Sequence, residues 1–429
     1  MSGELVIRGG RVLDQHGERM ADVLVRDGVV AEVGEGLSAT RELDAAGCIV
    51  TPGFVDLHTH LREPGMEEAE TVETGARAAA LGGYTAVVAM PNTDPPIDSA
   101  STARHVLDLG RSAPCDVHVA GAVTVGRRGS ALAPMAELHA LGVRIFTDDG
   151  DCVADARLMR RALEYARSLP GAVIAQHAED ASLVDGGHMH EGAWSSRLGI
   201  PGRPAEAEST IVARDIALAR LTGGRLHVLH ASTAATVALL REARAEGVAV
   251  SAEVTPHHLV LTDAACAAYD PAFKVNPPLR TSDHVGALRA GLADGTIAAV
   301  ATDHAPHPPE TKDQPFSEAP PGMLGLETAF AVVLTELVAP GVLDLARAVA
   351  AFTWEPAAVG GLEAHGRPVA PGEPANLAVV DPDAAWEVEP SALASRARNT
   401  PWAGRKLAGR VRHTILFGEA VVVDGEAER

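Results

Sequence analysis

The chain has 429 residues, of which 46% are hydrophobic and 22% are charged, with a formal net charge of −21. This composition is typical of a globular protein with ample core, so disorder is not expected. The acidic balance argues against nucleic acids and anionic membranes as main partners, because both are polyanions. No run reaches the ~18 apolar residues of a membrane span, and the four cysteines are widely spaced. We therefore expect a cytoplasmic protein without a disulfide framework.

The first 50 residues predict short strands and no helix. Apolar or alternating runs at 5–7, 23–25, 29–33 and 48–50 are separated by Gly9-Gly10 and Asp27-Gly28.

After Pro52 the pattern changes to eight short apolar runs that alternate with helix-like stretches. The runs are 53–56, 85–89, 117–122, 143–146, 172–175, 226–229, 249–253 and 297–301. Helical spacing occurs at 71–81, 154–168, 207–221, 233–246 and 282–292. Apolar strands alternating with helices predict a parallel sheet covered on both faces, and eight units suggest an α/β fold of the closed (β/α)8 TIM-barrel type. An open doubly wound sheet is the alternative, although no GxGxxG turn follows the first strand.

Strand-like runs return beyond Gly366, at 376–380, 411–416 and 420–423, broken by Asp381-Pro382 and Gly418. We expect residues 1–52 and 366–429 to form one small β domain beside a barrel of residues 53–365. The segment 306–321 is rich in proline and polar residues, and we expect either a mobile lid or an inert surface loop.

Polar side chains follow five of the eight expected strands. They are His58 and His60, Asp148 and Asp149, His177, His230, and Asp303. The carboxyl ends of barrel strands share one mouth, which is where barrel active sites lie. Four histidines and an aspartate there predict a divalent metal site, in which metal would activate water and polarise a carbonyl. Asp303 is placed to move protons. No Gly-x-Ser-x-Gly or Walker sequence supports a serine nucleophile or a P-loop.

A second set of residues indicates substrate anchoring: Arg62, Asn92, Asn276 and His307. An arginine beside a metal site at the mouth of the barrel suggests a substrate with a carboxylate, although Arg62 could instead pair with Glu63 or Glu67. The tandem His257-His258 is a weaker ligand candidate, because its rings should point to opposite sides. His188 and His190 lie in a glycine-rich loop and read as surface residues.

The string PGFVDLHTHLREPG at 52–65 resembles the metal-binding signature of the cyclic amidohydrolases. Further strings resemble bacterial type I dihydroorotases: AMPNTDPP (89–96), FTDDG (146–150), QHAED (176–180), AEVTPHHL (252–259), KVNPPLR (274–280), ATDHAPH (301–307) and NTPWAGRKLAGRV (399–411). The match covers nearly the whole chain in order.

The resemblance implies a barrel with a β-sandwich built from both termini. It implies one or two Zn²⁺ ions held by His58, His60, Asp149, His177, His230 and Asp303, with Asp148 and Asp151 as neighbouring candidates for the bridging carboxylate. Substrate contacts map to His60, Arg62, Asn92, Asn276 and His307, with backbone contacts at Pro321 and Gly322. Pro321 stands where the family has an aromatic residue.

The implied activity is reversible cyclisation of N-carbamoyl-L-aspartate to L-dihydroorotate in pyrimidine synthesis. Hydantoinases and allantoinases carry a carboxylated lysine on the fourth strand, whereas the only lysines here are Lys274, Lys312 and Lys406. A hydantoinase-like hydrolase, or a non-catalytic scaffold for aspartate transcarbamoylase, are the alternatives. The resemblance also suggests a homodimer that is compatible with a transcarbamoylase complex.

Overall fold

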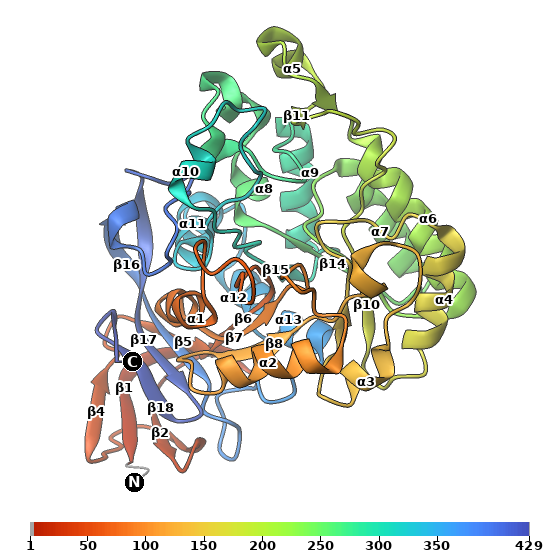
Figure 1. Cartoon of the computed structure of the whole chain (residues 1–429). Helices are drawn as coiled ribbons and strands as arrows, with labels where there is room; N and C mark the ends of the chain where they lie inside the picture. Colours follow the sequence, from red (N-terminus) through yellow and green to blue (C-terminus); the bar gives the residue numbers. More distant parts are fainter. Residues whose placement is uncertain (1–3, 429) are drawn as a thin grey trace.

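The computed structural model describes residues 4–428, and a barrel of parallel strands forms its larger part (Figure 1). The barrel strands are β6 (Phe54–Thr59), β7 (Tyr84–Ala89), β8 (Asp116–Val119), β9 (Ile145–Phe146), β10 (Val173–Gln176), β13 (Leu226–Val228), β14 (Val250–Val254) and β15 (Ala299–Val300). They form a three-stranded sheet, β6-β7-β8, and a five-stranded sheet, β15-β14-β13-β10-β9. Parallel bridges Gly121–Phe146 and Thr59–His304 join the two sheets. The expected closed α/β barrel is confirmed, with one strand near each of the eight runs.

Helices follow the barrel strands and cover them. The longer ones are α1 (Val72–Leu81), α2 (Ala100–Gly110), α4 (Ala156–Ala166), α6 (Glu206–Thr222), α7 (Ala234–Ala245), α9 (Ser282–Ala293), α12 (Leu345–Phe352) and α13 (Trp354–Gly360). Capping side chains set the starts of α1, α2, α4 and α7. Thr71 of α1 and Asp155 of α4, for example, accept from backbone N–H groups of the first turn. Shorter helices are α3 (Met135–His139), α5 (Ala193–Leu198), α8 (Pro256–Val260), α10 (Pro309–Lys312) and α11 (Ala329–Val333).

Both ends of the chain contribute to one nine-stranded sheet, where the red and blue strands of Figure 1 lie together. Its strands are β1 (Leu5–Asp14), β2 (Gly17–Arg26), β3 (Val29–Gly34), β4 (Arg41–Asp44), β5 (Ile49–Pro52), β16 (Leu377–Glu387), β17 (Lys406–Leu416), β18 (Glu419–Val423) and β19 (Glu426–Ala427). β5 pairs with β1 on one side and with β16 on the other, which joins the two ends of the chain. We propose that this sheet, as residues 1–52 and 366–429, is a domain distinct from the barrel of residues 53–365.

The terminal strands are longer than the sequence predicted. Asp381-Pro382 was expected to end a strand, but β16 continues to Glu387 with a break in register between Asp381 and Ala385. A bulge leaves the residues inside it outside the ladder, so a proline there costs no ladder hydrogen bond. β4 was missed, since its run RELD is short and mostly charged.

Two apolar layers hold the barrel. The inner layer contains Val55, Val88 and Ala175 from the strands, and α13 packs against it through Ala357 and Val359. The outer layer lies between strands and helices and includes Phe54, Phe330 and Phe352, whose rings are within 5.5 Å of one another, centroid to centroid. Tight packing of this kind holds the loops that follow the strands on a rigid frame.

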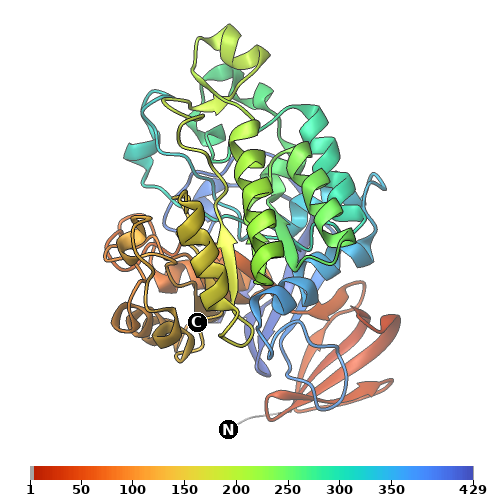
Figure 2. The ribbon, with the colours of Figure 1, turned by 90° about the vertical axis from the view of Figure 1, so that its right-hand side faces the viewer.

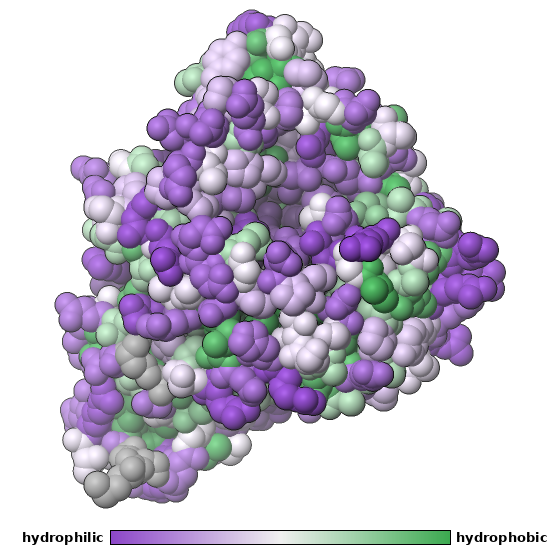
Figure 3. Space-filling view, viewed as in Figure 1, coloured by the Kyte–Doolittle hydropathy of each residue, from purple (hydrophilic) through white to green (hydrophobic). Residues whose placement is uncertain are grey.

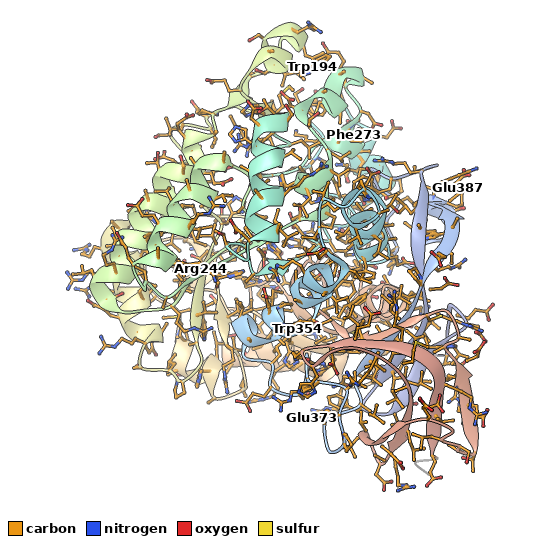
Figure 4. All side chains as sticks on the ribbon, turned by 180° about the vertical axis from the view of Figure 1, so that it is seen from behind. Trp194, Arg244, Phe273, Trp354, Glu373 and Glu387 are labelled. Atoms are coloured by element: carbon orange, nitrogen blue, oxygen red, sulfur yellow. The ribbon has the colours of Figure 1, made fainter. Side chains whose placement is uncertain are left out.

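The central helices and the terminal sheet lie on different sides of the barrel. Figure 2 shows helices of the central segment lined up beside the barrel, away from the terminal sheet. In Figure 4, Trp354 and Glu373 lie where the barrel meets that sheet, and Trp194 and Phe273 lie at the opposite end. The face in Figure 3 is mostly hydrophilic, with a hollow near its centre. Among residues 4–428, no helix is both long and apolar enough to span a membrane.

Candidate active site

Six imidazole and carboxylate side chains meet at the carboxyl ends of the barrel strands. They are His58 on β6, His60 directly after β6, Asp149 after β9, His177 after β10, His230 after β13 and Asp303 after β15, and all are buried. His230 and Asp303 have φ of 30° and 47°, and Arg62 beside them has φ of 63°. Non-glycine residues rarely adopt positive φ, and such strain collects where the surrounding fold enforces a functional geometry.

One half of the cluster contains His58, His60 and Asp149. Oδ2 of Asp149 is 3.4 Å from Nε2 of His58 and 3.6 Å from Nε2 of His60. Oδ1 of Asp303 lies 3.0 Å from Nε2 of His60 and 3.6 Å from Nε2 of His58. Both imidazole nitrogens and both carboxylates therefore point at one small volume.

The other half contains His177 and His230, and it shares Asp149. Oδ1 of Asp149 is 3.5 Å from Nδ1 of His177 and 3.6 Å from Nε2 of His230, while these two nitrogens are 2.9 Å apart. The two oxygens of one carboxylate thus face two separate pairs of imidazoles. This is the arrangement of a carboxylate that can bridge two cations.

The donor atoms fit a divalent metal. Nε2 of His58 and Oδ1 of Asp149 are buried without a hydrogen-bond partner among the described residues. Buried polar atoms rarely stay unpartnered, because each costs about 1–3 kcal/mol. The sets His58–His60–Asp149 and Asp149–His177–His230 each bring three ligand atoms within 4.8 Å of one another. Imidazole and carboxylate are ligands that Zn²⁺ accepts.

The charges of the cluster reinforce its ligand character. Burial alone would raise the pKa of Asp149 and Asp303, but the surrounding histidines hold both values below the ordinary range. Both carboxylates are therefore ionised at neutral pH. Burial lowers the pKa of Arg62 to about 10, which leaves its guanidinium charged. Burial, together with Arg62, lowers the pKa of His307 to about 3, so that imidazole is neutral.

The geometry separates the three aspartates that follow β9. Asp148 accepts from the backbone N–H groups of Val123 and Thr124, at 2.9 Å each, and from the hydroxyl of Thr124. Asp151 is ion-paired with Arg127 near the surface. Only Asp149 of the three turns toward the histidines, which favours it as the bridging ligand.

The sequence did not predict several residues that orient the proposed metal ligands. Oε1 of Glu253, on β14, lies 2.7 Å from Nδ1 of His58, and Oε2 lies 3.1 Å from Nε2 of His227. Such a contact fixes the tautomer and orientation of a metal-binding imidazole. The only signal in the sequence was a glutamate at the end of the apolar run 249–253. The structure shows that this glutamate is fully buried.

Arg203 was also missed, because it lies in the long excursion between β10 and α6. Its Nη1 donates to Oδ1 of Asn276 at 2.6 Å and to Oε2 of Glu179 at 2.8 Å. Nδ2 of Asn276 lies 3.3 Å from Nε2 of His177. Arg203 therefore orients the side-chain amide of Asn276, which is predicted to contact the substrate.

A cavity of about 250 Å³ adjoins the cluster. It is lined by the residues predicted to contact substrate, namely His60, Arg62, Asn92, Asn276, His307, Pro321 and Gly322, together with Asp149, His177, His230 and Asp303. Oδ1 of Asn92 is 2.9 Å from Nδ1 of His60. His58 lies behind this wall, since it is fully buried.

Arg62 points into this cavity rather than pairing with a glutamate. Its Nε donates to the carbonyl of Pro306 at 3.2 Å, and its Nη2 lies 3.5 Å from Nε2 of His307. Glu63 and Glu67, the alternative partners, instead accept from the backbone N–H groups of Val72 and Gly65. The charge of Arg62 is thus available to an anionic ligand.

The segment 306–321 is not an inert surface loop. It contains α10, and Lys312, Phe316 and Ala319 are buried. Nζ of Lys312 donates to the carbonyls of Pro320 and Gly322, at 2.9 and 3.1 Å. These bonds hold the backbone at Pro321 and Gly322 against the cavity.

Two expectations about other histidines were wrong. His190 is buried and lies 3.2 Å from Nη1 of Arg280, and His188 is half-buried rather than fully exposed. The adjacent rings of His257 and His258 are 4.6 Å apart, so they do not point to opposite sides. His258 is held by Thr255 and the carbonyl of Pro277, because Pro256 starts a short helix that turns both rings inward.

Known proteins share both the sequence and the fold. A family model described as "Dihydro-orotase-like" matches residues 47–236. Dihydroorotases of Streptomyces coelicolor and Mycobacterium tuberculosis are 52% and 51% identical, each over 98% of this chain and 99% of the relative. Among solved structures, an L-hydantoinase from Arthrobacter aurescens has a TM-score of 0.89 at 26% identity, over 100% of this chain and 98% of that chain. A dihydropyrimidinase from Brevibacillus agri has a TM-score of 0.86 at 26% identity, over 99% and 96%. The chain belongs to the dihydroorotase family of cyclic amidohydrolases.

Proposed function

We propose that this site interconverts N-carbamoyl-L-aspartate and L-dihydroorotate plus water, a step of pyrimidine synthesis. The observation that carries the proposal is the complete set of ionised carboxylates, imidazoles and one arginine around a single cavity, in a chain 52% identical to a dihydroorotase. A small cyclic amide with one carboxylate matches both parts of that cavity. The arginine suits the carboxylate, and the imidazole cluster suits the amide.

We assign His58, His60, Asp149, His177, His230 and Asp303 as the residues that hold one or two Zn²⁺ ions. Bound zinc lowers the pKa of water and polarises a carbonyl oxygen. Glu253 keeps the ring of His58 in position, and Asn92 does the same for His60. The protein thus presents the metal with ligands that are already oriented.

Asp303 moves the proton. In the hydrolytic direction, water adds to the ring amide carbonyl and the carboxylate of Asp303 takes its proton. The C–N bond then breaks, and Asp303 returns that proton to the leaving nitrogen. Cyclisation is the reverse sequence. The histidines that hold the pKa of Asp303 low keep it ionised, as a proton acceptor must be.

Arg62, Asn92 and His307 hold the substrate carboxylate, and Asn276 contacts the ring. The guanidinium of Arg62 supplies a charge-assisted hydrogen bond in a buried setting. His307 is neutral, and its Nε2–H donates to the carbonyl of Pro321 at 2.8 Å. We propose that the substrate carboxylate takes the place of this carbonyl, so that the ring donates one hydrogen bond without adding charge. Pro321 and Gly322 close the cavity from the side of the 306–321 segment.

The lysines distinguish this activity from that of a hydantoinase. Nζ of Lys274 donates to Ser317, Nζ of Lys312 donates to Pro320 and Gly322, and Lys406 lies on β17. None is on β9, so a carbamylated-lysine bridge has no donor here. The test compares turnover of L-dihydroorotate, hydantoin and allantoin by the purified protein. Preferred turnover of hydantoin or allantoin would overturn the proposal.

We further propose a cytoplasmic homodimer that is compatible with an aspartate transcarbamoylase complex. The four free cysteines support a reducing compartment. Light scattering of the purified chain, alone and mixed with the transcarbamoylase, tests the assembly. Turnover by the chain alone separates an enzyme from a scaffold that only supports its partner.

A further inference from the structure

We propose that Asp116, His118 and His365 form a second divalent-metal site, of the Zn²⁺ class, at the base of the barrel. Asp116 is the first residue of β8, whereas the candidate active-site residues follow the carboxyl ends of the strands. The two sites thus lie at opposite ends of the barrel. This inference does not depend on the proposed function.

The three ligand atoms already converge. Oδ2 of Asp116 is 3.2 Å from Nε2 of His118 and 2.9 Å from Nε2 of His365, and all three ligand atoms lie within 4.8 Å of one another. Tetrahedral zinc with bonds of about 2.0–2.1 Å separates its ligands by roughly 3.3 Å. The present spacing therefore needs only small side-chain movements to accept the ion.

Local structure explains why these side chains meet. Asp116 and His118 are two residues apart on a strand, so both point to the same face of β8. His365 arrives from the stretch between α13 and β16, and its ring is perpendicular to that of His118 at a centroid distance of 6.0 Å. Cys115 precedes Asp116 and points to the other face of the sheet, so its thiol does not join the set.

The hydrogen bonds of this cluster depend on the tautomer of His365. Nδ1 of His365 is 3.1 Å from the hydroxyl of Thr85. If the hydroxyl donates to Nδ1, then Nε2–H donates to Oδ2 of Asp116 at 2.9 Å. If Nδ1 donates instead, Nε2 presents a lone pair to that carboxylate, which is itself an acceptor. Nε2 of His118 is buried with no hydrogen-bond partner among residues 4–428. One cation satisfies all three acceptors, and the contact with Thr85 is the kind that orients a metal-bound histidine.

The site is open to solvent on one side. The side chains of Asp116 and His118 are 34% and 31% exposed, whereas that of His365 is only 1% exposed. A cavity of about 550 Å³ reaches Asp116 and His118, and its walls include Arg111, Phe417 and Glu419. An ion can therefore enter, and water can complete its coordination.

The position of the site indicates a structural role. His365 lies in the stretch between α13, which ends at Gly360, and β16 of the terminal sheet, which begins at Leu377. A metal bound to β8 and to His365 ties the barrel wall to that stretch. We expect such a clamp to stabilise the junction without taking part in turnover.

The test uses the full-length protein after chelation, reloaded with Zn²⁺ and dialysed. The variants are His118→Asn and Asp116→Asn, and the control is His105→Asn, because His105 is an exposed residue of α2. Elemental analysis should find one zinc equivalent fewer in each site variant than in the wild type and the control. Zn²⁺ should raise the unfolding temperature of the wild type and control by a few degrees more than that of either variant. Turnover of L-dihydroorotate should be unchanged in all of them.

A cobalt-loaded sample gives an independent readout. The visible spectrum of the wild type minus that of His118→Asn should show the absorption of one Co²⁺ bound to nitrogen and oxygen. Equal metal content in the wild type and both variants would overturn the site and leave a protonated His–Asp pair as the explanation. Loss of all zinc and of turnover in both variants, with the unfolding temperature unchanged, would also overturn it, because the site would then not be separate from the active site.

Discussion

Asp303 lies between the proposed metal ligands and the substrate cavity. It contacts His60, which belongs to the proposed metal set, and it faces the cavity. We predict that Asp303→Asn lowers kcat by about 10²–10⁴-fold, the usual size of a general acid–base contribution. The change is nearly isosteric, so the unfolding temperature should stay within a few degrees. Steady-state turnover of L-dihydroorotate with metal analysis checks this, and near-wild-type kcat would contradict the proton-transfer role.

Glu253 acts on the same centre without facing the substrate cavity. It is fully buried and holds Nδ1 of His58. We predict that Glu253→Gln weakens zinc binding by about 10–100-fold, since an amide orients the imidazole less well than a carboxylate does. Competition with a zinc indicator measures the affinity. Glu246→Gln, at an exposed helix end, is the control and should bind zinc as the wild type does.

Lys312 holds the 306–321 segment in its conformation. Its ammonium group is buried and bonded to two backbone carbonyls, those of Pro320 and Gly322. We predict that Lys312→Met raises KM for L-dihydroorotate severalfold with a smaller effect on kcat, because the cavity wall loses its anchor while Asp303 is untouched. Lys406→Met, on the exposed part of β17, is the matched control. Equal KM values in both variants would show that the segment is held by other contacts.

Glu327 links the barrel to the segment before β17. It accepts from the backbone N–H of Ala394 at 2.8 Å, and burial, with Glu70 nearby, raises its pKa to about 7. Between about pH 4.5 and 7 the native state keeps a proton that the unfolded state has released, so stability falls as pH rises. We predict that Glu327→Gln unfolds like the wild type at about pH 5 and is more stable by on the order of 1–3 kcal/mol at about pH 8. Thermal unfolding across this range checks it, and a constant difference would contradict the raised pKa.

The proposed active-site metal should stabilise the whole barrel against unfolding, because its ligands lie on or directly after five different barrel strands. Binding to the native state alone stabilises it, by about 2.7 kcal/mol when free ligand is at 100 times Kd. We predict that chelation abolishes turnover and lowers the unfolding temperature, and that Zn²⁺ restores both. Mg²⁺ should restore neither, since imidazole is a poor ligand for it. Full turnover after exhaustive chelation would contradict the metal assignment.

The amino-acid sequence was enough to predict the barrel and most side chains of the candidate site. Parallel strands place their carboxyl ends together, so polar residues that follow apolar runs must meet. His58, His177, His230 and Asp303 could be grouped for that reason. The absence of lysine from 143–149 likewise rules out a carbamylated-lysine metal bridge.

Only the tertiary structure decided which aspartate after β9 faces the histidines, because Asp148, Asp149 and Asp151 differ in backbone direction rather than in type. It also brought in Glu253 and Arg203, whose partners lie 195 and 73 residues away in sequence. The convergence of Asp116 and His118 with His365 has the same origin. Contacts between side chains on distant segments depend on packing, and a local pattern carries no information about them.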